Sequence, residues 1–317
     1  MKKLLFIVNP NAGRTAIKND IFEIVMTFQR GGYETVIYPT TGPKDAARKV
    51  MADGAGYDLI VCAGGDGTLN NTVNGYMHMG ERKVPIGYIP VGTTNDFAKG
   101  LCIPTKPIEA AELIMNSEPV KIDVGSFEDK EFVYVAAFGA FADISYSTSQ
   151  SMKKVMGHSA YIIEGIRNVA NYKAITLKAQ LDDMLITGDY IFGMITNSFS
   201  VGGFKLRGTK HVVLNDGKFD CFFIKWPKNP AEVQRIVSAL MANEYDGNEF
   251  FFMAKAARIS IESDQQIAWT LDGESGGSYS KVEITDQKKA LEMMIDISIA
   301  KGIAERTDVL TGMEENV

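Results

Sequence analysis

Short apolar runs alternate with helical patterns over the first 120 residues of the chain. Some of these runs are rich in β-branched or aromatic side chains and are followed closely by Gly, Pro or Asn, which is typical of buried strands: Leu4–Val8, Thr35–Tyr38, Leu59–Cys62 and Ile86–Ile89. Between the first two runs, apolar residues recur at helical spacing before Gly31-Gly32: Ile17, Ile21, Ile24, Val25 and Phe28. Strands and helices in alternation predict an α/β domain with a mostly parallel, doubly wound sheet.

The pattern changes after Pro119. Most later segments have the length and side chains that strands favour: 120–127, 131–138, 173–181, 184–197, 219–226, 250–262, 267–271 and 280–285. Two amphipathic stretches, near 159–171 and 230–242, predict helices. We therefore expect an α/β domain at residues 1–120 and a mainly β domain, a sandwich, at 121–294. The segment 295–317 is a candidate to pack back on the first domain.

Composition limits the classes of function. The chain has 317 residues, with 33 basic and 39 acidic side chains and a net charge of −6. No overall positive field would attract nucleic acid or an anionic bilayer. The apolar run Phe132–Ala142 is well short of the ~20 residues that span a bilayer, and Leu4–Val8 is too brief for a signal peptide. We expect a cytoplasmic protein whose three cysteines are reduced.

The loop Gly64-Gly65-Asp66-Gly67-Thr68 follows the third predicted strand and precedes a helical stretch. Glycines let backbone N–H groups approach an anion, and a helix N-terminus adds partial positive charge. Asp66 would repel a bare phosphate, so its presence favours a nucleotide that carries Mg²⁺. The alternative is a glycine-rich turn in which Asp66 caps a helix.

Two other glycine-bearing polar loops hold equivalent positions. Asn9-Pro10-Asn11-Ala12-Gly13 follows the first strand, and Gly92-Thr93-Thr94-Asn95-Asp96 follows the strand that ends near Ile89. Ligands of parallel sheets collect at the carboxyl ends of the strands. The three loops are therefore expected to converge on one crevice.

Taken together, these loops resemble those of a known family. Asn9-Pro10 with Gly13, the segment Gly64–Asn70 and the segment Pro90–Ala98 are similar to the diacylglycerol kinase catalytic-domain family, the soluble bacterial lipid kinases that include sphingosine-type kinases. Further segments match the family in order along the second domain: Ile122–Gly125, Asn197, Gly202-Gly203, Asn215–Gly217 and Leu271–Glu274. The resemblance implies a fold of the NAD kinase and diacylglycerol kinase type.

The resemblance also implies roles for individual residues. Glu274 would be the catalytic base, and Asp66 and Asp272 would join a carboxylate–water–metal network beside the nucleotide. A structural Mg²⁺ would be held by Asp216 with the backbone carbonyls of Val213 and Lys218. ATP would contact Asn9, Pro10, Asn11, Ala12, Gly13, Thr40, Gly65, Asp66, Gly67, Thr68, Leu69, Asn70, Asn71 and Thr93. The implied partners are a diacylglycerol-like lipid alcohol, the inner membrane surface during turnover, and a second copy in a homodimer.

General chemistry is consistent with these roles. Phosphoryl transfer to an uncharged lipid hydroxyl needs positioning, Mg²⁺ and a carboxylate that accepts the proton. In an extended segment, Asp272 and Glu274 project to one face. The alternative is that Asp272-Gly273 is only a turn and Glu274 a solvated side chain, and Asn-Asp-Gly at 215–217 is itself a favoured turn.

Two positions depart from the family pattern. Asn71 stands where the family usually has Glu, and Tyr134 stands where it commonly has Asn. Two other functions therefore stay open at the level of sequence: an NAD kinase-like small-molecule kinase, which shares the Gly-Gly-Asp-Gly-Thr loop, and a nucleotide- or lipid-binding protein without turnover. The segment Gly92–Ala98 and the triplet Asp272-Gly273-Glu274 favour the lipid kinase.

Overall fold

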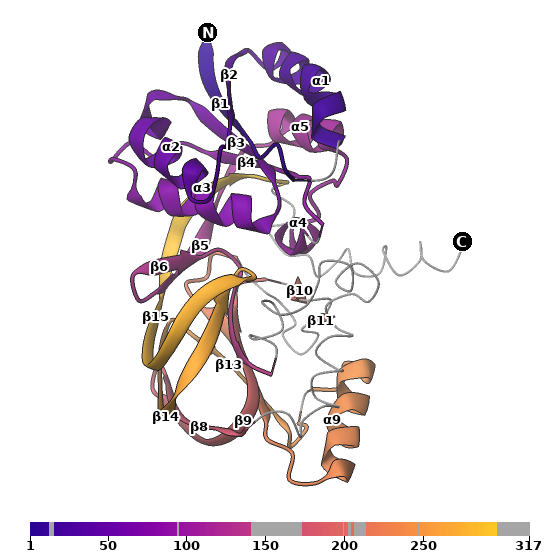
Figure 1. Cartoon of the computed structure of the whole chain (residues 1–317), viewed down its shortest axis with the longest axis vertical. Coiled ribbons are helices and arrows are strands. Elements are labelled where there is room, and N and C mark those ends of the chain that lie inside the picture. The colour runs from indigo at the N-terminus through magenta and orange to yellow at the C-terminus, as the bar shows by residue number, and fades with distance from the viewer. Residues whose placement is uncertain are drawn as a thin grey trace, which may run out of the picture.

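The protein folds into two lobes, stacked one above the other in Figure 1. The structure is a computed structural model that describes residues 1–12, 16–93, 95–140, 173–198, 200–201, 204–205, 214–245 and 247–296. The helix expected near 159–171 and nearly all of the segment 295–317 lie outside these residues.

The upper lobe is built on parallel strands in the order β4-β3-β1-β2. Its strands are β1 (Lys2–Val8), β2 (Tyr33–Pro39), β3 (Leu59–Gly64) and β4 (Ile86–Pro90). Its helices are α1 (Ala16–Arg30), α2 (Asp45–Asp53), the 3-10 turn η1 (Gly54–Gly56), α3 (Asp66–His78), α4 (Asp96–Gly100) and α5 (Pro107–Asn116). All residues of β3 and β4 are buried, as expected for central strands covered on both faces.

Helix α1 shows how the sequence pattern becomes packing. Its predicted apolar stripe faces the sheet, with Ile24 and Phe28 fully buried. The Phe28 ring meets Phe6 of β1 edge-to-face, with 5.3 Å between the ring centroids. The helix ends at Arg30, and Gly32 then adopts φ +86°, a conformation that glycine adopts without strain.

The lower lobe is rich in β-structure. It contains β5 (Pro119–Phe127), β6 (Lys130–Phe132), β7 (Val135–Gly139), β8 (Ile175–Leu181), β9 (Met184–Thr196), β10 (Ser200–Val201), β11 (Phe204–Lys205), β12 (Phe219–Lys225), β13 (Phe251–Ala256), β14 (Arg258–Leu271) and β15 (Glu274–Met294). Helix α9 (Pro230–Ala242) coincides with the helix predicted near 230–242. The core of the lobe is aromatic, with Trp269 centred 4.7 Å from Phe138 and 5.0 Å from Phe127.

The mainly β character predicted for this lobe is confirmed, and its described strands, apart from the short pair β10 and β11, belong to one continuous sheet. Strand β9 pairs with β8 through residues 184–190 and with β7 through residues 192–196. Strand β14 pairs with the same two partners, β8 through residues 259–263 and β7 through residues 269–271. These strands therefore close into a ring within one continuous sheet. Closure is possible because β9 and β14 are each long enough to pair with both β7 and β8 besides a third strand, β12 for β9 and β15 for β14. The pairing of β14 with β15 also shifts register between Glu262 and Ile267.

Strand β15 joins the two lobes. It begins at Glu274 in the lower lobe and reaches the upper sheet, where Met293 pairs in parallel with Ile86 of β4 (Figure 1). Strand β5 runs antiparallel beside it over much of this length. The first residue of β15 is therefore held on a strand anchored in both lobes. In the described part of the chain, no helix has the length and apolar character needed to cross a membrane.

Candidate active site between the lobes

The glycine-rich turn leads directly from β3 into α3. Strand β3 ends at Gly64, Gly65 is extended (φ −89°, ψ −176°), and α3 begins at Asp66. A Cβ on Gly64 would collide with the side chain of Thr68, so the turn requires glycine at this position. The N–H groups of Thr68 and Leu69 donate to the Gly65 carbonyl oxygen at 2.9 and 3.2 Å, whereas those of Asp66 and Gly67 precede the first helical acceptor, and such a terminus attracts anions.

The loops after β1 and β4 pack against this turn. From one side, Asn9 Nδ2 donates to Thr68 Oγ1 at 3.1 Å. From the other, Gly92 lies so close that a Cβ on it would be 2.5 Å from the Cα of Gly65. The three loops singled out in the sequence therefore lie together at the carboxyl ends of β1, β3 and β4.

Asp66 bridges two of these loops. Its carboxylate accepts hydrogen bonds from the backbone N–H groups of Asp96 (3.1 Å) and Phe97 (3.4 Å), at the start of α4. Burial, and then the nearby carboxylates of Asp96 and Asp272, raise the pKa of Asp66 to about 6. Asp66 thus caps a helix, as the alternative interpretation proposed, but the helix is α4 and not the one that Asp66 begins.

Asp272 is the most buried carboxylate of the region, with 2% of the residue exposed. It accepts hydrogen bonds from the backbone N–H groups of Val133 (2.7 Å), Tyr134 (3.0 Å) and Val135 (3.0 Å). The side-chain amide of Asn70, on α3, donates to the same carboxylate at 2.7 Å. Burial raises the pKa of Asp272, and these hydrogen bonds oppose that rise. With its oxygens engaged in this way, Asp272 is suited to holding the structure and not to exchanging a proton with a substrate.

Glu274 lies across from the glycine-rich turn. A Cβ built on Gly67, the second residue of α3, would be 2.8 Å from Glu274 Oε1. The glutamate comes from the lower lobe, at the first residue of β15, and its residue is exposed. The structure therefore brings an unburied carboxylate from one lobe to the anion-attracting helix terminus of the other.

Comparisons with known proteins show the family to which the chain belongs. Residues 3–127 match the model of the diacylglycerol kinase catalytic domain. The chain is 31% identical to the diacylglycerol kinase of Bacillus subtilis (strain 168) over 306 residues, which cover 93% of this chain and 100% of that protein. It is also 31% identical to the diacylglycerol kinase of Staphylococcus haemolyticus over 275 residues, 86% of this chain and 82% of that protein. The chain belongs to the diacylglycerol kinase family.

Solved structures place the fold in the same group. A crystal structure from Bacillus anthracis str. Sterne, assigned as a diacylglycerol kinase, superposes with a TM-score of 0.81 at 25% identity and covers 94% of this chain and 96% of that one. An NAD kinase from Archaeoglobus fulgidus in complex with ATP superposes with a TM-score of 0.52 at 11% identity, covering 94% of this chain and 96% of that one. The second likeness shows a shared fold alone.

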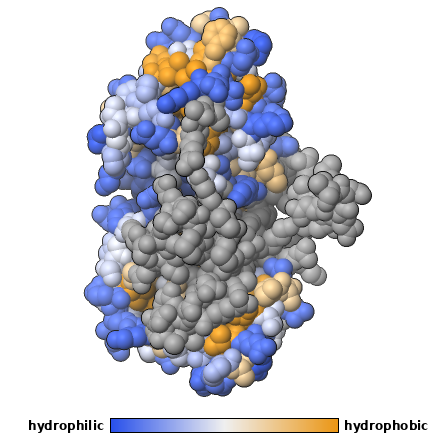
Figure 2. Space-filling view, turned by 45° about the vertical axis from the view of Figure 1, so that its right-hand side comes forward, coloured by the Kyte–Doolittle hydropathy of each residue, from blue (hydrophilic) through white to orange (hydrophobic). Residues whose placement is uncertain are grey.

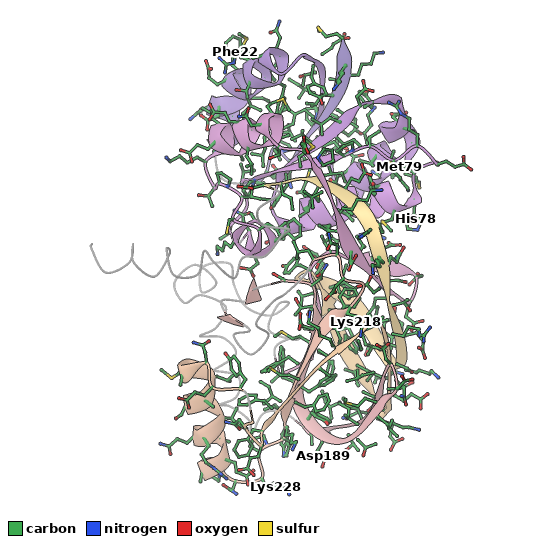
Figure 3. The ribbon with its side chains drawn as sticks, turned by 180° about the vertical axis from the view of Figure 1, so that it is seen from behind. Phe22, His78, Met79, Asp189, Lys218 and Lys228 are labelled. Carbon is green, nitrogen blue, oxygen red and sulfur yellow. The ribbon has the colours of Figure 1, made fainter. Side chains whose placement is uncertain are left out.

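The predicted Mg²⁺ ligands around Asp216 are only partly described. Val213 lies outside the described residues. The Asp216 carboxylate accepts from the backbone N–H of Lys218 at 3.0 Å and from Lys255 Nζ at 3.2 Å. Figure 3 labels Lys218 in the lower lobe. Among the described residues, no three His, Cys, Asp or Glu side chains are arranged to hold a metal ion. The Mg²⁺ site therefore stays a prediction, and Lys255 supplies a positive charge to Asp216 in this arrangement.

The other predicted ATP contacts fall into three groups. Leu69 is 1% exposed and packs in the core, so only its backbone could face a ligand. Gly13 lies outside the described residues. The remaining positions border the loops and are partly or fully exposed: Asn9, Pro10, Asn11, Ala12, Thr40, Gly65, Gly67, Thr68, Asn70, Asn71 and Thr93.

The two departures from the family pattern have structural consequences. The side-chain amide of Asn71 donates to the carbonyl oxygen of Gly67 at 2.7 Å, a bond that a glutamate could not donate. Tyr134 is buried, and its ring centroid lies 6.2 Å from that of Phe97. Burial, and then the charge of Asp66, hold the pKa of Tyr134 well above its usual value. Tyr134 is thus a packing residue behind the site.

Sequence reasoning missed one supporting residue of the site. Tyr88, inside the apolar strand β4, donates its hydroxyl to the Gly64 carbonyl oxygen at 3.3 Å. Asn95 supports the neighbouring loop after β4: it adopts a left-handed conformation (φ 51°) and exchanges two hydrogen bonds with Gly92, at 2.9 and 3.0 Å. Asn95 was within a recognised motif but had no assigned role, and a tyrosine in an apolar strand gives no sequence signal.

Proposed function

We propose that this protein transfers the γ-phosphoryl group of ATP to the hydroxyl of diacylglycerol or a related lipid alcohol, giving phosphatidic acid or its equivalent. Membership of the family makes it a lipid kinase, a phosphotransferase with an alcohol acceptor. One observation carries the assignment of roles: the carboxylate of Glu274 lies beside Gly67, on the opposite lobe, at the start of α3.

In this proposal the upper lobe binds the nucleotide. The backbone N–H groups of Gly65 and Gly67, at the N-terminus of α3, donate hydrogen bonds to the phosphate oxygens, and the loop at Asn9 borders the same space. Bound Mg²⁺ would spread the charge that develops on the transferred group. Asp66 orders the two loops through its bonds to the start of α4.

In the same proposal the lower lobe supplies the catalytic base for the phosphoryl acceptor, which is the lipid hydroxyl. The lipid hydroxyl forms the new bond to the γ-phosphorus as the bond to the leaving ADP oxygen breaks, and the hydroxyl proton passes to the Glu274 carboxylate. Asp272 keeps the turn that carries Glu274 in place through its four hydrogen bonds. Asp272 and Asp66 are therefore proposed as supporting groups and Glu274 as the base.

The lipid substrate requires contact with a membrane surface, which we propose to be transient and peripheral, for a cytoplasmic protein that works at the inner membrane. The net charge of −6 makes general electrostatic attraction to an anionic bilayer unfavourable. Among the residues that Figure 2 colours by hydropathy, hydrophobic ones gather near the top of the upper lobe and on part of the lower lobe, and hydrophilic ones surround them. Apolar contact is therefore the mode of docking we favour, and the homodimer stays a prediction.

A substrate panel tests the proposal. The purified protein receives ATP radiolabelled at the γ-phosphate and, in separate mixed-micelle reactions, diacylglycerol, a sphingoid base or NAD. We expect label in phosphatidic acid with diacylglycerol and none in NADP. Labelled NADP with unlabelled lipids would replace the lipid kinase by an NAD kinase-like enzyme, and no transfer in any reaction would favour a binding protein without turnover.

A further inference from the structure

Asn70 links the two lobes at the candidate site. It lies on α3, one turn after Asp66, and its Nδ2 donates to Asp272 Oδ2 at 2.7 Å. The same nitrogen donates to the backbone carbonyl oxygen of Glu131, on β6, at 3.3 Å. One side-chain amide of the upper lobe is thus bonded to two separate segments of the lower lobe.

The hydrogen-bond pattern requires a donor at this position. Asn70 Oδ1 accepts from Asn74 Nδ2 at 3.1 Å, so the amide nitrogen of Asn70 is the group that faces Asp272. The Asp272 carboxylate is already bonded to three backbone N–H groups, from Val133 to Val135. An acidic side chain at position 70 would set a second carboxylate against a buried one, which is strongly unfavourable.

The spacing of residues connects this link to Glu274. Asn70 and Gly67 are three residues apart on one helix, and Asp272 and Glu274 are two residues apart on one turn. That turn is tightly specified, because Asp272 has φ +50° and Gly273 has φ +84°. Fixing Asn70 against Asp272 therefore also sets the position of the Glu274 backbone relative to Gly67.

We propose that Asn70 is a positioning residue for phosphoryl transfer: acting through Asp272, it holds Glu274 at the glycine-rich turn and so sets the spacing of the lobes at the site. The inference rests on the proposed function, because it takes Glu274 as the base. It also separates Asn70 from direct binding of ATP. Both hydrogens of the Asn70 amide are directed at the lower lobe, to Asp272 and Glu131.

Two variants and a control test the proposal. Asn70→Ala removes the donor, and Asn70→Asp replaces it by an acceptor of nearly the same shape. We expect kcat to fall by about 10-fold in Asn70→Ala and about 100-fold in Asn70→Asp, since loss of positioning acts on the chemical step. The Kd for ATP, measured by calorimetry without lipid, should stay within about 3-fold of wild type in both variants. Asn248→Asp, a matched change beside α9, should leave kcat and Kd unaltered.

The pH dependence of kcat distinguishes loss of the hydrogen-bond donor at position 70 from a general loosening of the structure. In Asn70→Asp the two carboxylates repel, and protonation of the introduced carboxylate would restore an O–H donor toward Asp272. We expect kcat of Asn70→Asp, divided by that of wild type, to rise as the pH falls, and the same ratio for Asn70→Ala to stay flat. Division by wild type cancels the effects of the other titratable and charged groups that surround the pair: Asp66 on α3, Asp96 on α4, Glu131 on β6 with His78 beyond it, Tyr134 after β6, and Glu274 on β15.

Hydrogen exchange of backbone amides tests the link between Asn70 and Asp272 without requiring that the protein phosphorylate a lipid. The amides of Val133, Tyr134 and Val135 should exchange at least about 10-fold faster in Asn70→Asp than in wild type or in Asn248→Asp. If wild type fails to phosphorylate any lipid, the proposed function falls, while these amides still test the link between the lobes. The proposal is overturned if Asn70→Asp keeps kcat within about 2-fold of wild type, if both ratios have the same pH profile, or if only the Kd for ATP rises.

Discussion

Two turns of the lower lobe, at Asp216-Gly217 and Asp272-Gly273, share the dipeptide Asp-Gly and have different surroundings. Gly217 has φ +83° and Gly273 has φ +84°, so each turn uses its glycine in the same left-handed conformation. The Asp272 residue is 2% exposed and its carboxylate is bonded to four N–H donors. The Asp216 side chain is 29% exposed and pairs with Lys255, itself 30% exposed.

The difference comes from distant parts of the chain. The donors to Asp272 lie 137 to 139 residues away, in the β6–β7 connection and at the first residue of β7, and 202 residues away on α3. The Asp216 carboxylate accepts from the backbone N–H of Lys218, two residues later, and from Lys255 of β13. The same dipeptide is thus a buried junction between lobes in one place and a partly solvated turn in the other. Its function depends on what packs around it.

The largest expected effect is on stability at Asp272. In Asp272→Asn, the new amide N–H groups face N–H donors, so buried donors lose their acceptor. We expect the free energy of unfolding to fall by about 3–5 kcal/mol. The matched change Asp216→Asn should cost at most about 1 kcal/mol, because a partly exposed ion pair is weak. Urea denaturation of both variants measures the contrast, and equal losses would remove the distinction between the turns.

Asp66 is expected to show the next largest effect, as a dependence of stability on pH. Its folded pKa, about 6, lies above the usual value, so folding favours the neutral carboxyl group. This stability is present below pH ~4 and is lost as the pH rises through ~6. The free energy of unfolding of wild type, minus that of Asp66→Asn, should therefore fall by roughly 2–3 kcal/mol between about pH 4 and pH 7.5.

An opposite slope in that difference would show that the charged form of Asp66 is the stabilising one. In that case its hydrogen bonds to the start of α4 would outweigh burial. Subtracting the Asp66→Asn curve is necessary because the pKa values of Asp220 and Asp286 are also raised, mainly by burial, to about 6 and about 7.

Gly67→Ala tests the contact between the lobes with a smaller change. The new Cβ would be 2.8 Å from Glu274 Oε1, and the flexible glutamate must move away. We expect kcat to fall by about 10-fold. The free energy of unfolding should stay constant or rise by about 0.5–1 kcal/mol, as alanine favours helices. Gly80→Ala has open space around its Cβ and serves as the control. A stable Gly67→Ala variant with full kcat would place Glu274 outside the reaction.

The smallest expected effect concerns Mg²⁺ at Asp216. If Asp216 holds a structural ion, Mg²⁺ should raise the melting temperature of wild type by a few degrees, about 1 kcal/mol, and a chelator should reverse the rise. Asp216→Ala should abolish the response. A melting temperature of wild type that is the same with Mg²⁺ and with chelator would reject the site and leave Lys255 as the partner of Asp216.

Local patterns predicted much of this architecture. The apolar runs located β1, β3 and β4, and the helical stripe located α1, because periodicity depends on nearby residues. The ring in the lower lobe was not predictable, since only β8 and β9 are neighbours along the chain, and the pairings of β7 with β9 and of β14 with β7 and β8 join distant segments. At the site, the sequence identified Asp66, Asp272 and Glu274. It could not show that Asp66 caps α4 or that Asn70 meets Asp272, because both bonds join segments distant in sequence.

The role of Glu274 is tested most directly by rapid-quench phosphoryl transfer. Wild type and Glu274→Gln are mixed with saturating Mg²⁺, ATP and diacylglycerol, and formation of phosphatidic acid is followed within one turnover. We predict that the rate of the chemical step falls by at least about 100-fold in Glu274→Gln, with the Kd for ATP and the free energy of unfolding close to wild type. A transfer rate equal to that of wild type would contradict the account.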